Sequence, residues 1–137
     1  MPYIRSDEAI KALLGQARVI AVVGHSDDPA RTSYRVAQYL RQVGYTVYPV
    51  NPTVDTIDGQ PSYRSLADVP EPIDIVDVFR RSEHLSGIVE EAAAVGAKAV
   101  WSQLGVVDED AAIKAVQAGL TMVMDRCTMA DHRRLLR

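Results

Sequence analysis

This chain has little cysteine and no excess of basic charge. Its 137 residues include one cysteine, Cys127, so no disulfide can form within the chain and a reducing compartment is expected. The formal net charge is -3, which argues against sequence-independent nucleic-acid binding, because that function needs a broad basic surface. No apolar run approaches the roughly 20 residues that a membrane helix requires. These absences leave binding of a small ligand, including an anion held by local groups, as an open function.

The composition is that of an ordinary globular protein. Hydrophobic residues make up 47% of the chain and charged residues 24%. A length of 137 residues predicts a single domain, residues 1–137, which is long enough to bury a core. The first seven residues include Arg5 and Asp7 and no apolar stretch, so we expect no signal peptide and a cytoplasmic location.

Short apolar runs alternate with helical patterns along the whole chain. The runs predict strands at 19–23, 46–50, 73–79, 97–101 and 120–124, and the patterns predict helices at 6–16, 34–43, 83–95 and 108–118. Val19 to Val23 is continuously apolar, which is typical of a central parallel strand that is buried on both faces. The alternation predicts an α/β fold, a three-layer Rossmann-like doubly wound sheet of about five parallel strands with helices on both faces.

Several local signals mark the ends of these elements. Ser6, Ser33 and Ser82 are expected to cap the helices that follow them. Asp58-Gly59 predicts a tight turn in a small hairpin between residues 55 and 63. Residues 65–69 are expected to form one helical turn. Residues 125–137 are expected to form a polar tail, helical towards its end.

In a doubly wound sheet the ligand lies beyond the carboxyl ends of the strands, where the strand order reverses. This rule directs attention to the five segments that follow the predicted strands. They are residues 24–33, 51–52, 79–82, 102–105 and 125–127.

The loop after the first strand carries groups suited to phosphate. Gly24 allows a sharp turn and a close approach of the backbone to a ligand. Ser26, Thr32 and Ser33 bring hydroxyl groups to a helix N-terminus, where free N–H groups attract anions, and Arg31 adds a forked cationic donor. The loop has neither the further glycines of the dinucleotide fingerprint nor the Gly-Lys-Ser/Thr end of a Walker A loop. An ordinary solvated connection with cap residues is the alternative interpretation.

The end of the second strand separates two cofactors. An NAD-binding domain is expected to place an acidic residue there to hold the ribose hydroxyls. Asn51-Pro52 occupies this position, and no carboxylate follows until Asp55. A carboxylate would repel the ribose 3′-phosphate of coenzyme A, so its absence favours coenzyme A over NAD. Simple termination of the strand by Pro52 is the alternative.

These segments together resemble the CoA-binding domain family, which comprises stand-alone Rossmann-like domains related to the N-terminal domain of the succinyl-CoA synthetase α subunit. The resemblance covers nearly the whole chain. Its carriers are AVVGHSDDP (21–29) with Arg31 and Ser33-Tyr34, YPVNP (48–52), IDIVDVFRR (73–81), AKAVWSQLG (97–105) and VMDRC (123–127).

The resemblance implies a ligand contact at each strand end. The first loop would hold the pyrophosphate of coenzyme A through Gly24, His25, Ser26, Arg31, Thr32 and Ser33. Asn51 and Pro52 would border the adenosine, Val78, Phe79 and Arg80 would flank the nucleotide, and Gln103, Leu104 and Gly105 would line the path of the pantetheine arm. The related synthetases carry a phosphohistidine on a second domain, so a single domain is expected to bind coenzyme A without ligating it.

The remaining chemistry-bearing residues favour structural interpretations. Cys127 is expected to be inert, and Trp101 to pack in the core or at its rim. Asp74 and Asp77 lie within the third predicted strand, where a catalytic carboxylate and a hydrogen-bonded structural one are both open interpretations. The three histidines and Cys127 form no recognisable metal pattern, so no metal site is expected. No nucleophile and base can be paired, so we predict no enzymatic activity.

The leading prediction is a non-catalytic module that binds coenzyme A or acyl-CoA, acting as a carrier, sensor or regulator. The alternatives are an NAD(P)-binding oxidoreductase-type domain and an interaction protein with a vestigial pocket. The expected partner is a small nucleotide ligand, with no nucleic acid and no membrane. A partner enzyme and a homo-oligomer both remain open.

Overall fold

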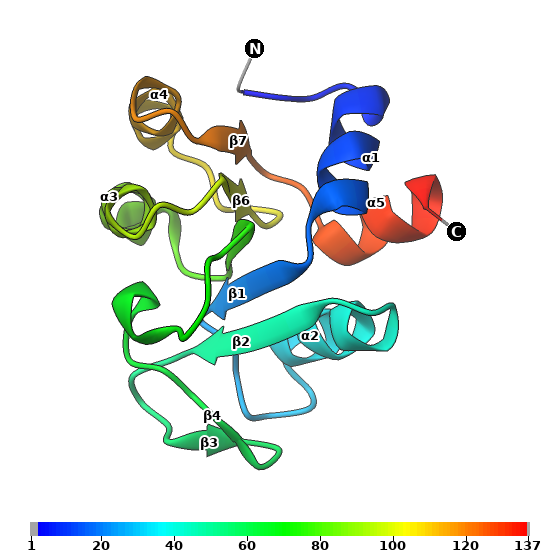
Figure 1. Ribbon diagram of the computed structural model, residues 1–137, viewed down its shortest axis with the longest axis vertical. Helices are drawn as coiled ribbons and strands as arrows, with labels where there is room; N and C mark the ends of the chain where they lie inside the picture. The colour runs from blue at the N-terminus through cyan, green and yellow to red at the C-terminus, as the bar shows by residue number, and fades with distance from the viewer. Residues whose placement is uncertain (1–2, 137) are drawn as a thin grey trace.

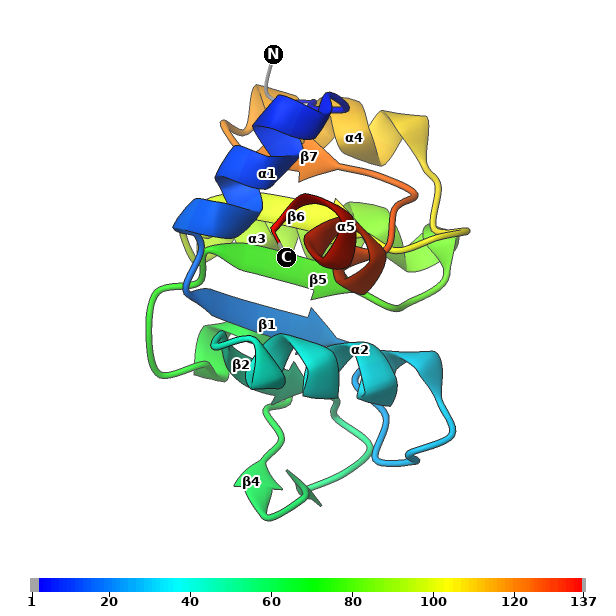
Figure 2. The same cartoon turned by 90° about the vertical axis from the view of Figure 1, so that its right-hand side faces the viewer.

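A five-stranded parallel sheet forms the centre of the protein. The computed structural model describes residues 3–136. The sheet consists of β1 (Val19–Val23), β2 (Thr46–Val50), β5 (Ile75–Val78), β6 (Ala99–Ser102) and β7 (Thr121–Val123) in the order β2-β1-β5-β6-β7. Every neighbouring pair is parallel, and the arrowheads in Figure 2 point to one common edge. The predicted five strands are therefore confirmed, although β5, β6 and β7 are shorter than expected and β6 ends one residue later.

Helices cover both faces of this sheet. They are α1 (Asp7–Gln16), α2 (Thr32–Gln42), α3 (Leu85–Ala94), α4 (Glu109–Gln117) and α5 (Thr128–Leu135). α1, α2 and α5 cover one face, while α3 and α4 pack together on the other (Figure 1). The three-layer Rossmann-like α/β fold predicted from the sequence is thus confirmed.

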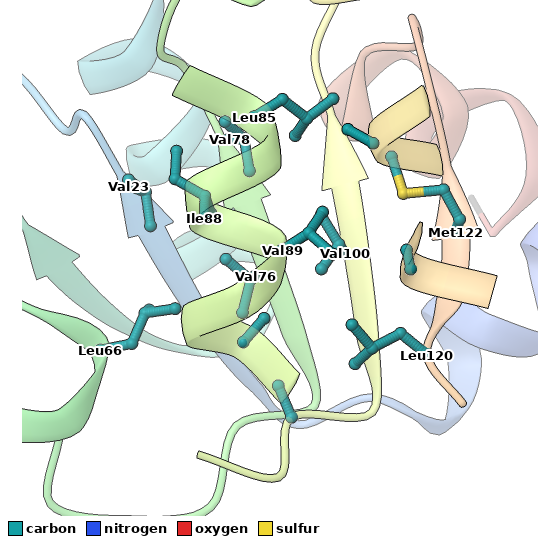
Figure 3. Close-up of a cluster of buried hydrophobic side chains, with 14 of the residues drawn as sticks. Val23, Leu66, Val76, Val78, Leu85, Ile88, Val89, Val100, Leu120 and Met122 are labelled. Atoms are coloured by element: carbon teal, nitrogen blue, oxygen red, sulfur yellow. The ribbon is translucent and has the colours of Figure 1, made fainter. Parts of the chain in front are cut away.

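The core consists of two apolar clusters, one on each face of the sheet. Ala21 and Val23 of β1 belong to the cluster beneath α3 and α4, and Ile20 and Val22 to the cluster beneath α1, α2 and α5. Figure 3 shows the first cluster filling the space between α3 and strands β5 and β6. β1 is uninterrupted by polar residues because alternate side chains enter different cores, and no side chain of this strand faces water.

The connection from β2 to β5 carries the smaller elements. β3 (Thr56–Ile57) and β4 (Gln60–Pro61) form the predicted hairpin, which lies at the bottom of Figure 1. Its turn residues Asp58 and Gly59 both have positive φ, 52° and 81°, as a two-residue hairpin turn requires. A 3-10 helix, η1 (Leu66–Asp68), confirms the predicted helical turn.

Two predicted caps are wrong. Arg31 is the N-cap of α2, and Ser33 lies inside the helix, where its hydroxyl accepts a hydrogen bond from the Ser26 N–H at 2.9 Å. Ser82 begins a 3-10 helix, η2 (Ser82–His84), before α3, and its hydroxyl accepts from the Val107 N–H at 2.8 Å. Both serines had the cap residue type, but tertiary partners compete for their oxygens.

The chain after β7 is more than a polar tail. α5 buries Thr128, Asp131 and His132 against the rest of the protein. Trp101 is fully buried, and its indole N–H donates to the Arg126 carbonyl at 2.8 Å, which ties this segment to β6. Among residues 3–136 no helix has the length and apolar character needed to cross a bilayer.

Candidate functional site

The strand order reverses between β1 and β5, and the loops that follow these two strands touch there. Gly24 ends β1 with φ at +88°. A Cβ atom on this residue would lie 3.0 Å from the carbonyl oxygen of Phe79 and 3.1 Å from Cδ of Arg80. Only glycine satisfies both the backbone angle and the close approach. The carboxyl edge at this point is the position where doubly wound sheets bind ligands.

Internal hydrogen bonds fix the loop between β1 and α2. The Asp28 N–H donates to the Ser26 hydroxyl at 3.0 Å, and the Ala30 N–H donates to the Asp28 carboxylate at 2.9 Å. Together with the bond from the Ser26 N–H to the Ser33 hydroxyl, these contacts shape the loop without using the backbone N–H groups of the first turn of α2. Arg31, the N-cap, supplies no side-chain cap. Within residues 3–136 the N–H groups of the first turn of α2, at positions 32–34, have no acceptor.

Three amide hydrogens and the positive end of the α2 dipole therefore remain available to an anion. Arg31 and Thr32, both predicted site residues, are exposed beside them. The hydroxyls of Ser26 and Ser33 are instead engaged in holding the loop.

His25 lies beneath this loop and is fully buried. Its Nδ1 is 2.7 Å from the Ser26 carbonyl, and its Nε2 is 3.2 Å from Nη1 of Arg41. Because the guanidinium can only donate, Nε2 is the acceptor and Nδ1 carries the hydrogen. Burial lowers the pKa of His25, although the bond to Ser26 opposes that shift, so the ring is neutral. Both ring nitrogens are thus occupied within the protein.

Asn51 supports the same loop from the end of β2. Its Nδ2 donates to the His25 carbonyl at 2.9 Å, while its Oδ1 accepts from the Thr53 N–H at 3.0 Å and the Thr53 hydroxyl at 2.7 Å. Pro52 is exposed. It borders a cavity of about 80 Å³ next to the ends of β1 and β2, which Arg64, Arg80 and Glu91 also line.

The three predicted residues at the end of β5 lie in different environments. Val78 is fully buried among the side chains under α3, and only its carbonyl, which accepts from the Gln103 N–H, points towards the next strand. Phe79 and Arg80 are half-buried at the crossing with Gly24. Phe79 lines a second cavity and Arg80 lines the first.

Neighbouring loops hold the loop after β6 in a fixed shape. The Gly105 N–H donates to the Asp125 carboxylate at 2.7 Å, and the Ser82 hydroxyl donates to the Gly105 carbonyl at 3.4 Å. The Ser102 hydroxyl donates to the Val106 carbonyl at 2.8 Å. Gly105 has φ at +84° and is exposed, as is Leu104, with 69% of its surface accessible.

The second cavity has a volume of about 360 Å³. The residues that line it come from the loops after three of the five sheet strands and from the start of α2, and all but Gln103 and Thr32 are apolar or sulfur-bearing. They are Thr32, Phe79, Gln103, Leu104, Val106 and Cys127. Cys127 is the half-buried N-cap of α5, and its side chain caps no amide.

A buried polar triad lies behind this cavity. Nε2 of Gln103 donates to Oδ1 of Asp77 at 2.5 Å and to Oγ1 of Thr128 at 3.0 Å, and the Thr128 hydroxyl donates to Oδ2 of Asp77 at 2.9 Å. Complete burial raises the pKa of Asp77 to about 7, although both hydrogen bonds favour the carboxylate. Both oxygens of the Asp77 carboxyl thus have hydrogen-bond partners within the protein.

The structure adds candidates that the sequence did not reveal. Arg64 reaches the smaller cavity because the chain after the hairpin returns beside β2, where Tyr63 bridges to Val50. No local pattern marks Arg64, since its position depends on the path of the hairpin. Val106 and Cys127 line the larger cavity, and Cys127 was interpreted as inert. Residues 3–136 contain no cluster of three or more His, Cys, Asp or Glu suited to a metal ion.

Comparisons with known proteins agree with this geometry. The Bacillus subtilis protein YneT is 43% identical over 127 residues, which are 93% of this chain and 94% of YneT. A Pyrococcus horikoshii protein of solved structure is 41% identical and superposes with a TM-score of 0.94, over 97% of this chain and 94% of its own. The α subunit of an ADP-forming acetate–CoA ligase of Pyrococcus furiosus is 31% identical over 84 residues. That match covers 61% of this chain but only 18% of the ligase subunit.

The model of one protein family, described as the CoA binding domain, matches residues 18–133. The matched segment runs from the residue before β1 into α5 and includes all five strands and both cavities. The chain therefore belongs to the CoA-binding domain family, as the sequence resemblance suggested.

Proposed function

We propose that the protein is a single non-catalytic module that binds coenzyme A or an acyl-CoA along the carboxyl edge of its sheet. It would serve as a carrier, sensor or regulator of acyl-CoA metabolism. The observation that carries this proposal is the N-terminus of α2. Its first-turn N–H groups lack acceptors within residues 3–136, and α2 follows the loop that meets the end of β5 at Gly24. Such a site suits an anion, and the pyrophosphate is the anionic group of coenzyme A that we assign to it.

The two cavities supply places for the two ends of the ligand. The nucleotide end lies towards the smaller cavity, bordered by Pro52, Arg64 and Arg80. The pantetheine arm lies in the larger cavity, past Phe79 and Gln103, with its thiol or thioester near Cys127. His25 and Asn51 act indirectly in this proposal, by holding the loop that carries the phosphate site.

Local charge supports an anionic ligand despite the net charge of -3. Coenzyme A carries about four negative charges near neutral pH, taking a second phosphate pKa near 6. Arg31 and Arg64 are exposed beside the site, and Arg80 is half-buried within it. Glu91 also lines the smaller cavity, so these four side chains carry a formal local charge of about +2, which offsets about half of the ligand's charge without a basic surface elsewhere.

The second candidate function is binding of NAD or NADP. The end of β2 argues against it, because Asn51 occupies the place of the expected acid and uses its amide inside the protein. Two measurements on the purified protein separate these functions: isothermal titration calorimetry with CoA, NAD and NADP, and thermal unfolding in the presence of each ligand. We expect heat of binding and a raised melting temperature with CoA alone.

The Arg31→Ala variant tests the position of the phosphates. Loss of a charge-assisted hydrogen bond of about 1.5–3 kcal/mol should weaken CoA binding by about tenfold or more. Arg18→Ala is the matched control, because Arg18 is an exposed arginine directly before β1, at the opposite edge of the sheet. Equal affinity for CoA in both variants would contradict the phosphate assignment, and binding of NAD in preference to CoA would contradict the proposed function.

A further inference from the structure

One polar atom of the Gln103 side chain has no hydrogen-bond partner within residues 3–136, and the contacts with Asp77 and Thr128 identify which atom it is. As a carboxylate, Asp77 can only accept through Oδ1, so the Gln103 atom 2.5 Å away is the amide nitrogen. The Thr128 hydroxyl donates its hydrogen to Asp77 and is left as an acceptor for the second amide hydrogen. Both N–H groups of Gln103 are therefore used inside the protein.

This leaves the carbonyl oxygen, Oε1, which accepts no hydrogen bond from any of residues 3–136. Within residues 3–136, the side-chain polar atoms that are both fully buried and without a hydrogen-bond partner are two nitrogens of Arg41. Because Oε1 of Gln103 has no partner and is not among them, it retains some solvent-accessible surface. Gln103 itself is only 5% exposed and lines the larger cavity. The accessible part of this buried amide is thus an acceptor that faces the cavity.

The orientation persists when Asp77 is protonated on Oδ2. When Asp77 takes up a proton on Oδ2, Thr128 Oγ1 can accept that proton as well as the Gln103 N–H. Oδ1 then continues to accept from Gln103. The cavity therefore presents the same acceptor when Asp77 is ionised and when it carries a proton on Oδ2.

We propose that Asp77 and Thr128 are positioning residues, which hold the Gln103 amide so that Oε1 accepts a hydrogen bond from an N–H of the amide-bearing arm of the ligand. This inference rests on the proposed function, and it adds a basis for specificity. The cavity is matched to a ligand arm that carries amide N–H groups. A nucleotide without such an arm leaves Oε1 without a partner.

Two ligands separate this role from a general effect on the fold. Coenzyme A carries the arm, whereas adenosine 3′,5′-bisphosphate retains the phosphorylated nucleoside and lacks it. The Gln103→Met variant keeps the length of the side chain but removes the acceptor. We expect it to bind coenzyme A about tenfold more weakly, the loss expected for one hydrogen bond, and to bind the bisphosphate within about twofold of the wild type. Gln117→Met, at the exposed end of α4, is the matched control and should change neither affinity.

Asp77→Leu tests whether the carboxyl acts through Gln103. We expect the same selective loss of coenzyme A affinity, and no further loss when Asp77→Leu is added to Gln103→Met, because the acceptor is already absent. If Asp77→Leu does not fold, as judged by circular dichroism, Thr128→Val takes its place, with a smaller selective loss expected.

The outcomes are distinct. An equal loss of affinity for both ligands in Gln103→Met, or no loss for coenzyme A, would overturn the positioning role. Additive losses in the double variant would overturn the part assigned to Asp77. A wild-type protein that binds the bisphosphate as tightly as coenzyme A would show that the arm makes no net contact, while binding of neither ligand would refute the proposed function itself.

Discussion

Replacement of Asp77 by asparagine should change how the stability of the protein depends on pH. Asp77 is 0% exposed in the centre of the sheet, and burial raises the pKa of its carboxyl from 3.8 to about 7. Between these two values the folded protein binds a proton that the unfolded chain has released. The free energy of unfolding contributed by this group is therefore greatest at low pH and falls as the pH rises through that window.

The magnitude follows from the size of the shift. A displacement of about three units corresponds to about 4 kcal/mol, since each unit is worth 1.36 kcal/mol. This is a large share of the 5–15 kcal/mol that stabilises a typical domain. Asparagine has no proton to lose, so the free energy of unfolding of Asp77→Asn should lack this decline. Relative to the wild type, the variant should gain about 4 kcal/mol between pH 4 and pH 8.

Urea unfolding at a series of pH values measures this difference. Trp101 is the single tryptophan and is fully buried, so its fluorescence reports the transition directly. Burial lowers the pKa of His132, and the pKa of His25 is lowered as well, so both groups destabilise the fold as the pH falls. These contributions are the same in the two proteins and cancel in the comparison.

Asp55→Asn, at an exposed position before the hairpin, serves as the control and should follow the wild type at every pH. A difference between Asp77→Asn and the wild type that stays constant from pH 4 to pH 8 would refute the reasoning. A difference that grows in the opposite direction would mean that the hydrogen bonds to Asp77 outweigh its burial.

Two further predictions concern the loop after β1. Gly24→Ala should lower the free energy of unfolding by about 1–3 kcal/mol more than Gly59→Ala does. Both glycines have positive φ, but only at Gly24 would the new Cβ meet the Phe79 carbonyl. Chemical unfolding of the two variants tests this prediction, and equal losses would contradict it. Ser33→Ala removes the acceptor of the Ser26 N–H, a hydrogen bond worth about 1 kcal/mol. Hydrogen exchange at the Ser26 amide should therefore become faster, and CoA affinity should fall several-fold. Unchanged exchange would show that the loop keeps its shape without this bond.

The layered fold could be predicted because its strands are encoded locally. Residues 19–23 and 75–78 are buried on both faces, so each strand is an almost continuous apolar run that no exposed element would carry. α5 is harder to predict, because the residues it buries, Thr128, Asp131 and His132, are polar and give the segment no hydrophobic pattern. Its burial depends on hydrogen bonds with distant partners, which a hydrophobic pattern does not detect.

The site could be located from the sequence but not resolved into roles. The strand ends identified the crevice, because topology alone brings the loops after β1 and β5 together. Nothing local indicated that His25 turns its ring under α2 or that Asn51 bonds to its carbonyl. Gln103 is separated by 26 residues from Asp77 and by 25 from Thr128, so their triad exists only in the folded chain.

The central claim is that the free amides at the start of α2 hold the diphosphate of coenzyme A. A titration of the 15N-labelled protein with coenzyme A, followed by NMR, tests it most directly. The largest chemical-shift changes are expected at the backbone amides of Thr32, Ser33 and Tyr34, which have no acceptor within residues 3–136. Changes confined to the opposite edge of the sheet, around Arg18 and Thr46, or no changes at saturating ligand, would contradict the account.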